Sequence, residues 1–218
     1  MKKNLKLLWL MGIIFTIFLA NGVLADPSLN STNITAQGGN VTFIDLNLTG
    51  QQSTLWQGFY GTVTGGIALS DGNNNTFYDW NLVSAIGEVL ATRSIIPDWT
   101  GINCTNQTEI YEEEERLSIL NESTNSINNT FKNTTHPSFD VGGRLMENCR
   151  STKTSNSTTE QAVFWNILLN SNSTNTVYTV IIENDVVGFN GDIVDFQLLV
   201  PVDADTGQST YQLYIELT

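Results

Sequence analysis

Short segments in which apolar and polar residues alternate recur along most of the chain. Near its start, Ile44, Leu46 and Leu48 would share one face of an extended segment. Similar alternation, or a short apolar run between turn residues, recurs at 56–63, 67–70, 76–82, 88–92, 162–169, 177–183, 193–200 and 209–217. Both patterns are typical of β-strands, and the polar connections suit antiparallel neighbours. The sequence therefore predicts an all-β fold, an antiparallel β-sandwich-like domain.

Residues 94–153 break this pattern and are expected to form an insertion in the sandwich. Thr108 can cap a helix over residues 109–120, whose first half carries the acidic run Glu112–Glu115. Negative charge near a helix N-terminus is favoured by the helix dipole. A tract rich in Asn, Ser and Thr follows at 121–135 and has few apolar residues. The insertion is therefore expected to contain one helix.

The chain has two cysteines, Cys104 and Cys149, and both lie within the insertion. An even pair in an exported protein predicts a disulfide, whereas zinc sites need more ligands than two cysteines and one distant histidine. We expect the bond to close the base of the insertion.

The first 25 residues have the three regions of a cleavable secretory signal peptide. Three lysines precede an apolar run from Leu7 to Ala20, and a polar stretch ends in a small residue, Ala25. The run is shorter than the about 20 apolar residues of a membrane-spanning helix. An uncleaved N-terminal anchor is one alternative. An archaeal type IV pilin is another, but its processing site has a charged residue and a glycine before the apolar run, whereas here Lys6 is followed directly by Leu7. The prediction is a mature chain with a polar arm at 26–37 and a single domain at 38–218, and without a membrane span.

Twelve Asn-x-Ser/Thr sequons lie downstream of the signal peptide. In a secreted protein such sites accept N-linked glycans, although loops rich in Asn and Thr also generate sequons by composition alone. The sequon at Asn103 adjoins Cys104, and we do not expect it to be used. The expected acceptors are Asn30, Asn33, Asn40, Asn47, Asn74, Asn106, Asn121, Asn128, Asn133, Asn156 and Asn172.

The balance of charge excludes a nucleic-acid partner. The chain has 22 acidic and 9 basic residues and a formal net charge of −13. The signal peptide holds three lysines and no acidic residue, so its removal changes the charge to −16. Neutralising phosphates requires clustered Lys and Arg, and such a cluster is missing from this sequence.

Candidates for chemistry are few. His136 is the single histidine and sits in a polar stretch, where a surface or loop-packing role is the better interpretation. Glycoside cleavage needs two carboxylates paired in space, and the sequence offers four candidates without pairing them. These are Glu88, Asp185, Asp192 and Asp195. Asp203–Gly207 resembles the start of a calcium loop but lacks its remaining ligands, so a turn between strands explains it.

Several aromatic residues, most of them in the first half of the chain, invite a sugar-stacking hypothesis. Core packing explains most of them, because aromatic side chains dominate core energetics. The residues concerned are Trp56, Phe59, Tyr60, Phe77, Tyr78, Trp80, Trp99 and Trp165.

The segments Gln57–Gly65, Asn75–Trp80, Gly87–Val89 and Leu198–Pro201 resemble those of uncharacterised secreted surface proteins of archaea. The resemblance covers most of the mature chain, implies a cell-surface location and a β fold, and carries over no active-site residues.

Three functional classes follow. The first expectation is a secreted or cell-surface N-glycosylated structural or adhesion protein, without catalysis or cofactor, whose partners are copies of itself or other surface proteins. The second is a filament subunit that lends residues 26–48 to a neighbour by strand addition. The third is a glycan-binding module or glycoside hydrolase.

Overall fold

The computed structural model describes residues 28–37, 54–63, 66–70, 76–81, 85–96, 98–157, 162–172 and 175–217. Within 28–37, 66–70 and 76–81 only the backbone is described. The expected signal peptide and the strand expected at 40–48 lie outside these residues. Strands make up most of the described part, and their pairings are antiparallel, which confirms the predicted fold class.

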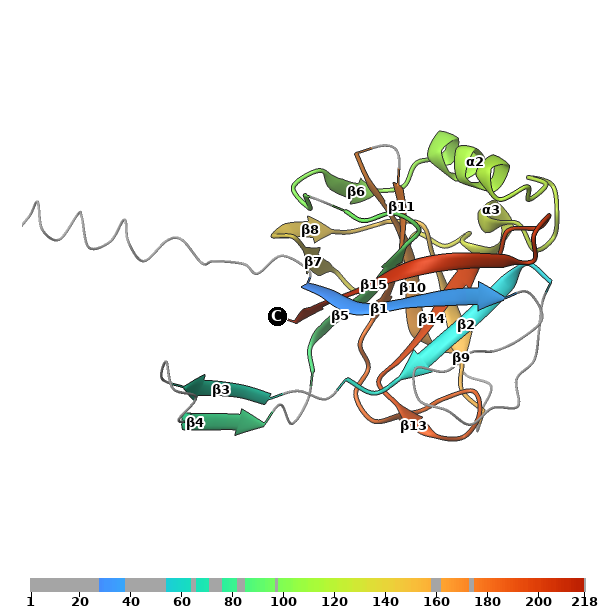
Figure 1. The fold of residues 1–218 in the computed structure, drawn as a ribbon. Coiled ribbons are helices and arrows are strands. Elements are labelled where there is room, and N and C mark those ends of the chain that lie inside the picture. Colours follow the sequence, from blue (N-terminus) through green and yellow to red (C-terminus); the bar gives the residue numbers. More distant parts are fainter. Residues whose placement is uncertain are drawn as a thin grey trace, which may run out of the picture.

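The largest sheet has seven strands in the order β1-β15-β5-β11-β10-β6, with β9 also pairing to β10 (Figure 1). It brings strands from the beginning, middle and end of the chain together. The strands are β1 (Ser28–Gln37), β5 (Gly87–Thr92), β6 (Ile102–Cys104), β9 (Ser151–Ser155), β10 (Ala162–Ser171), β11 (Asn175–Ile181) and β15 (Gln208–Leu217).

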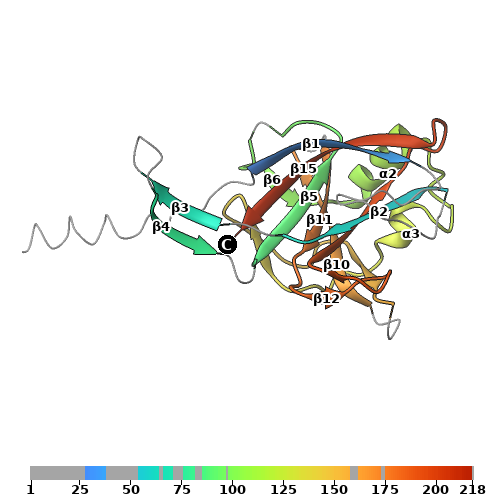
Figure 2. The same ribbon diagram turned by 60° about the horizontal axis from the view of Figure 1, so that its bottom comes forward.

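A second, smaller sheet packs on one face of the first. It consists of β2 (Trp56–Gly61) and β14 (Phe196–Pro201), which run side by side across the larger sheet (Figures 1 and 2). β14 contacts β11, β10 and β5 of the larger sheet. This two-layer arrangement is sandwich-like.

The central strands β5 and β11 of the large sheet are buried on both faces and carry apolar residues on both sides. Along β5, Val89 and Ala91 face the first core cluster and Leu90 faces the second. The first cluster is shared with β2, β14 and the helices, and includes Phe59 and Leu198. The second cluster lies on the opposite face, under the segment that contains the disulfide. The sheet therefore holds together two separate cores.

The helix expected in the insertion is present, but its bounds differ from those predicted. α2 spans Gln107–Arg116, and Asn106 rather than Thr108 caps it. The Asn106 side chain accepts a hydrogen bond from the Glu109 amide, and the Glu109 carboxylate accepts one from the Asn106 amide. This reciprocal capping box fixes the helix start. The expected helix extended to Leu120, but this residue lies beyond the helix end and is 78% exposed.

The rest of the insertion covers both faces of the sheet. A second helix, α3 (Ile127–Thr130), was not predicted, and it places Ile127 and Phe131 in the first cluster. A short hairpin, β7 (Phe139–Val141) and β8 (Arg144–Met146), covers the second cluster with Phe139 and Met146. The Asn-rich tract thus supplies more core residues than its composition indicated.

Three further elements lie at the margins of this body. The expected polar arm contains strand β1, which pairs with β15 of the same chain. A small hairpin of β12 (Val186–Val187) and β13 (Ile193–Val194) precedes β14. Two of the expected strands, β3 (Gly66–Ser70) and β4 (Thr76–Asn81), form a hairpin that pairs only within itself and projects away from the rest (Figures 1 and 2). None of the described helices is long and apolar enough to cross a membrane.

Candidate functional site

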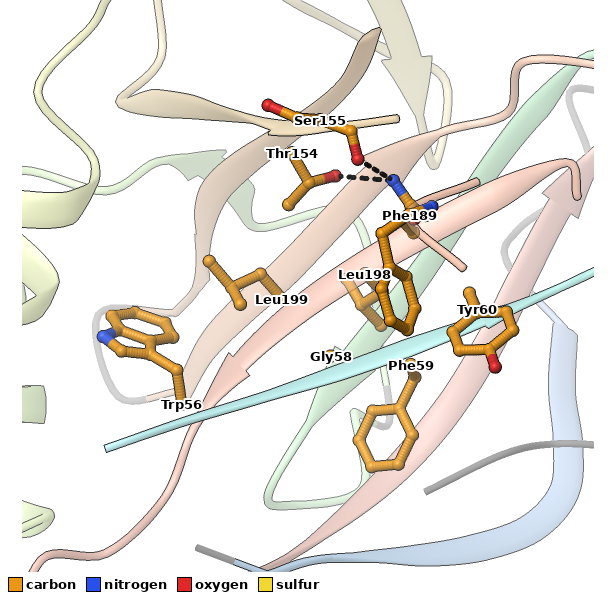
Figure 3. A pocket seen from close by; sticks show the side chains of 10 residues that line it. Trp56, Gly58, Phe59, Tyr60, Thr154, Ser155, Phe189, Leu198 and Leu199 are labelled. Atoms are coloured by element: carbon orange, nitrogen blue, oxygen red, sulfur yellow. Dashed lines mark hydrogen bonds between the residues drawn. The ribbon is translucent and has the colours of Figure 1, made fainter. Parts of the chain in front are cut away.

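A hollow of about 380 Å³ opens on the outer face of the small sheet (Figure 3). Gly58 lies on its floor, and a side chain there would meet no heavy atom within 4 Å. Trp56 and Tyr60, two positions away on either side of Gly58, flank the hollow together with Phe189. The rings of Tyr60 and Phe189 meet edge to face with centroids 4.9 Å apart. The glycine and the aromatic pair therefore create the hollow between them.

The polar side chains around the hollow are tied into the framework. Gln197 donates from Nε2 to Thr154 Oγ1 at 3.3 Å and to the Ser155 carbonyl at 3.2 Å, and its Oε1 accepts from the Phe189 amide at 2.7 Å. Burial raises the pKa of Tyr60 to about 12, with a further contribution from Asp192, so this phenol stays neutral. The hollow is suited to binding an apolar group rather than to proton transfer.

Asn166 on β10 joins the two sheets behind this hollow. Its Oδ1 accepts from the Leu199 amide at 2.7 Å, and its Nδ2 donates to the Gln197 carbonyl at 2.9 Å. The side-chain amide of Asn166 thus supplies the hydrogen bonds that a neighbouring strand would make at the β14 edge. Without it, these backbone groups of β14 would be buried without partners. This explains why a buried asparagine lies among apolar residues in the middle of β10.

Of the four predicted carboxylates, Glu88 acquires a carboxylate neighbour. It is the cross-strand partner of Glu216 on β15, and each is only 3% exposed. Glu216 accepts from the Gly142 amide at the tip of the β7–β8 hairpin, at 3.0 and 3.2 Å. Burial, followed by the charges of Glu216 and Asp140, raises the pKa of Glu88 to about 8. At neutral pH, Glu88 is therefore mostly protonated.

The other three candidate carboxylates lie in or next to the β12–β13 hairpin. Asp195 accepts from the Val63 amide at 2.6 Å and from the Asp185 amide at 3.0 Å. Asp192 accepts from the Asn190 side chain. These contacts explain the carboxylates of Asp192 and Asp195 as loop supports, whereas Asp185 takes part through its backbone amide. The charges next to Glu88 are those of Glu216 and Asp140 instead.

A buried ion-pair network that no sequence pattern indicated docks α2 onto the sheet. Glu113 is 2% exposed, and it pairs with Arg93, which directly follows β5, at 2.8 Å and with Arg116 of its own helix at 2.9 Å. The Tyr178 hydroxyl lies 3.2 Å from Glu113 Oε1. No sequence signal links Arg93 to the helix, since the pairing is made by the fold.

His136 and Asp203 have structural partners. The Cys149 amide donates to His136 Nε2 at 2.9 Å, next to the disulfide, while Nδ1 lies 2.8 Å from the Pro137 carbonyl. Asp203 Oδ1 accepts from the amides of Asp205 and Thr206 at 3.0 and 2.8 Å, as in an ordinary turn. Across the described part of the chain, no group of three or more His, Cys, Asp or Glu could hold a metal ion.

The predicted disulfide is present, with Cα atoms of Cys104 and Cys149 4.9 Å apart. Several expected glycan acceptors lie within the described residues and differ in exposure. The exposed ones are Asn106, Asn121, Asn133 and Asn172, while Asn128 and Asn156 are partly buried. The side chains of Asn30 and Asn33 on β1 are not described, and Asn40, Asn47 and Asn74 lie outside the described residues.

Among the aromatic candidates, Trp56, Phe59, Tyr60 and Trp99 are buried, which confirms the core interpretation for these four. Trp165 is half-buried, with the Lys153 ammonium 4.0 Å from its ring centroid. No protein-family model, curated protein or solved structure was found to match this chain.

Proposed function

We propose that this chain is an exported, N-glycosylated structural or adhesion protein of the cell surface, acting without catalysis. The position of the sequons carries the proposal. Asn106, Asn121 and Asn133 are exposed on the segment that the Cys104–Cys149 disulfide closes. Disulfides persist in oxidising compartments, where N-glycans are also added. The signal-peptide pattern and the resemblance to secreted archaeal proteins agree with export.

The projecting β3–β4 hairpin supports a role in contacting a partner. Ile67 lies opposite Trp80 in its register, and Leu69 lies opposite Tyr78. Since directly opposed residues share a face, these four positions give the hairpin one apolar face. An isolated two-stranded hairpin is marginally stable in water, and an apolar face gains stability when a partner covers it.

Mapping the glycans tests the first part of the proposal. The protein is produced in a host that N-glycosylates exported proteins, and occupancy is measured by mass spectrometry after enzymatic deglycosylation. We expect high occupancy at Asn121 and Asn133. Asn128 is the internal control: the sequence made it an expected acceptor, but it is partly buried, so we expect lower occupancy there than at the exposed Asn121 and Asn133. Unmodified asparagines at 121 and 133 in an exported chain would contradict the proposal.

Substitutions in the hairpin test the second part. The double variant Tyr78→Ser/Trp80→Ser changes the apolar face, and Ala68→Ser/Asp79→Ser changes the opposite face in the same register. We expect the first variant alone to abolish retention of the protein on the surface of producing cells, measured by fractionation and immunoblotting. Equal retention of both variants and the wild type would show that the hairpin plays no part.

A filament subunit is the second candidate, and the hollow over Gly58 favours it. Among the described strands, β2 pairs only with β14, whose other edge is bonded by Asn166. An added strand would therefore pair with β2 and place a side chain in the hollow. Pairing of β1 with β15 in the same chain argues against lending residues 28–37, whereas residues 38–48 lie outside the described part. Electron microscopy of the purified mature protein distinguishes the candidates, because only the second yields filaments.

A further inference from the structure

A groove of about 540 Å³ runs along the face of α2 that points to solvent. Its helical wall consists of four residues at the spacing of a single helix face, Thr108, Tyr111, Glu112 and Glu115. All four are exposed, whereas Ile110 on the opposite side of the helix is buried in the first core cluster. The groove is therefore a surface feature that a ligand can reach.

The chain folds back after α2 and forms the other wall of the groove. Ser118 has a φ of 53°, in the left-handed region, and the Ile119 amide donates to the Glu114 carbonyl at 2.8 Å. This pairing is that of a Schellman motif, which ends a helix and turns the chain. The residues of the turn that line the groove are Ser118, Ile119, Leu120 and Asn121. The helix end thus brings Leu120 and Asn121 into the same groove as the helical residues.

The groove combines exposed apolar surface with hydrogen-bond acceptors. Tyr111 is 40% exposed and Leu120 is 78% exposed, the largest fraction among the large apolar side chains of the described residues. Glu115 follows Tyr111 by about one helical turn and supplies a carboxylate. A neutral sugar ring matches this surface, because its C–H groups pack on an aromatic ring while its hydroxyl groups donate to a carboxylate. The negative charge disfavours an acidic ligand.

Asn121 provides the attachment point for such a sugar. It is exposed, lines the groove and begins the sequon Asn121-Glu122-Ser123. We propose that the N-glycan of Asn121 lies in this groove, with a neutral sugar packed against Tyr111 and Leu120. A covalently attached sugar docks without the loss of translational freedom that a free ligand must overcome, so weak contacts suffice. This placement rests on the N-glycosylation proposed above and goes beyond it, because attachment alone does not require contact with the protein.

Thermal unfolding of the glycosylated protein tests the contact through a double-mutant cycle. Asn121→Gln removes the glycan, and we expect it to lower Tm by about 2–4 °C, as for the loss of a small apolar contact in a domain of this size. In the Tyr111→Ala background, the same substitution should change Tm by less than about 1 °C, because the contact is already lost. Asn133→Gln, which removes an exposed sequon that does not line the groove, is the matched control and should have the same effect in both backgrounds.

Mass spectrometry at Asn121 distinguishes failure of this proposal from failure of the proposed function. An unmodified Asn121 would contradict both the glycosylation at this site and the docking. An occupied Asn121 whose removal has equal effects in both backgrounds would overturn the docking alone. Nuclear Overhauser effects between sugar protons and the Tyr111 ring are expected in the glycosylated wild type and not in Asn121→Gln. Dimerisation that Leu120→Ser abolishes would assign the groove to a second copy of the chain and overturn the proposal.

Discussion

The buried carboxyl group of Glu88 leads to a sharp prediction about stability and pH. Its pKa is about 8 in the folded protein, against 4.5 for an unperturbed glutamate. An acid whose pKa is raised by folding binds its proton more tightly in the folded state. Stability is therefore highest below about pH 4.5 as far as this group is concerned, and it falls as pH rises towards 8.

The magnitude follows from the size of the pKa shift. Each unit corresponds to about 1.4 kcal/mol, so Glu88 alone is expected to lower the free energy of unfolding by about 3–5 kcal/mol between pH 4 and pH 9. The substitution Glu88→Gln keeps the size of the side chain and removes its ionisation. The charges facing it, Glu216 on β15 and Asp140 on β7, remain. The variant should match the wild type near pH 4.5 and exceed its stability by several kcal/mol at pH 9.

Urea denaturation followed by tryptophan fluorescence, at intervals of one pH unit from 4.5 to 9, measures this difference. Glu122→Gln is the control, because Glu122 is exposed and its substitution should leave the curve parallel to that of the wild type. A Glu88→Gln curve that runs parallel to the wild type over the whole range would refute the reasoning.

Three further predictions concern stability at fixed pH, each measured by urea denaturation. Replacing Cys104 and Cys149 by serine should lower the free energy of unfolding by about 4 kcal/mol, because the bond closes a loop of 45 residues. Gly142→Ala should cost more than Gly207→Ala: both have positive φ, but a Cβ at 142 would lie 2.8 Å from Trp99 Cβ, whereas the space at 207 is open. Asn106→Ala should cost about 1 kcal/mol through loss of the helix cap.

The sequence predicted the strands well where a local pattern was strong. Seven of the nine expected strand positions coincide with observed strands at 56–61, 66–70, 76–81, 87–92, 162–171, 175–181 and 208–217. The run expected at 193–200 is divided at Asp195 into β13 and β14, because this residue turns its carboxylate to the backbone of Val63 and Asp185. The strand expected at 40–48 stays a prediction.

The sequence pattern did not correctly predict elements that are stabilised by tertiary contacts or by specific side-chain hydrogen bonds. The polar arm forms a strand because β15 offers it an edge, and residues 28–37 have too few apolar positions to reveal this. In α2, Asn106 and Thr108 are both acceptable caps by composition. The reciprocal bond between Asn106 and Glu109 decides between them.

The candidate sites depended on the fold even more. Glu216 alternates with apolar residues in the last strand and reads as an exposed position, yet the insertion covers that face and buries it. Arg93 and Arg116 come from different segments, and only the docking of α2 brings them to one carboxylate.

By itself, the sequence determined what local chemistry controls: the alternation that makes strands, the paired cysteines, the acidic charge and the positions of the sequons. Only the tertiary structure decided the partners of each strand. It placed the consecutive strands β14 and β15 in different sheets, the first beside β2 and the second between β1 and β5. Period-2 alternation tells which residues share a face of a strand, but it carries no information on which strand lies beside it. Which strands pair is decided by how the two hydrophobic cores pack, one on each face of the large sheet.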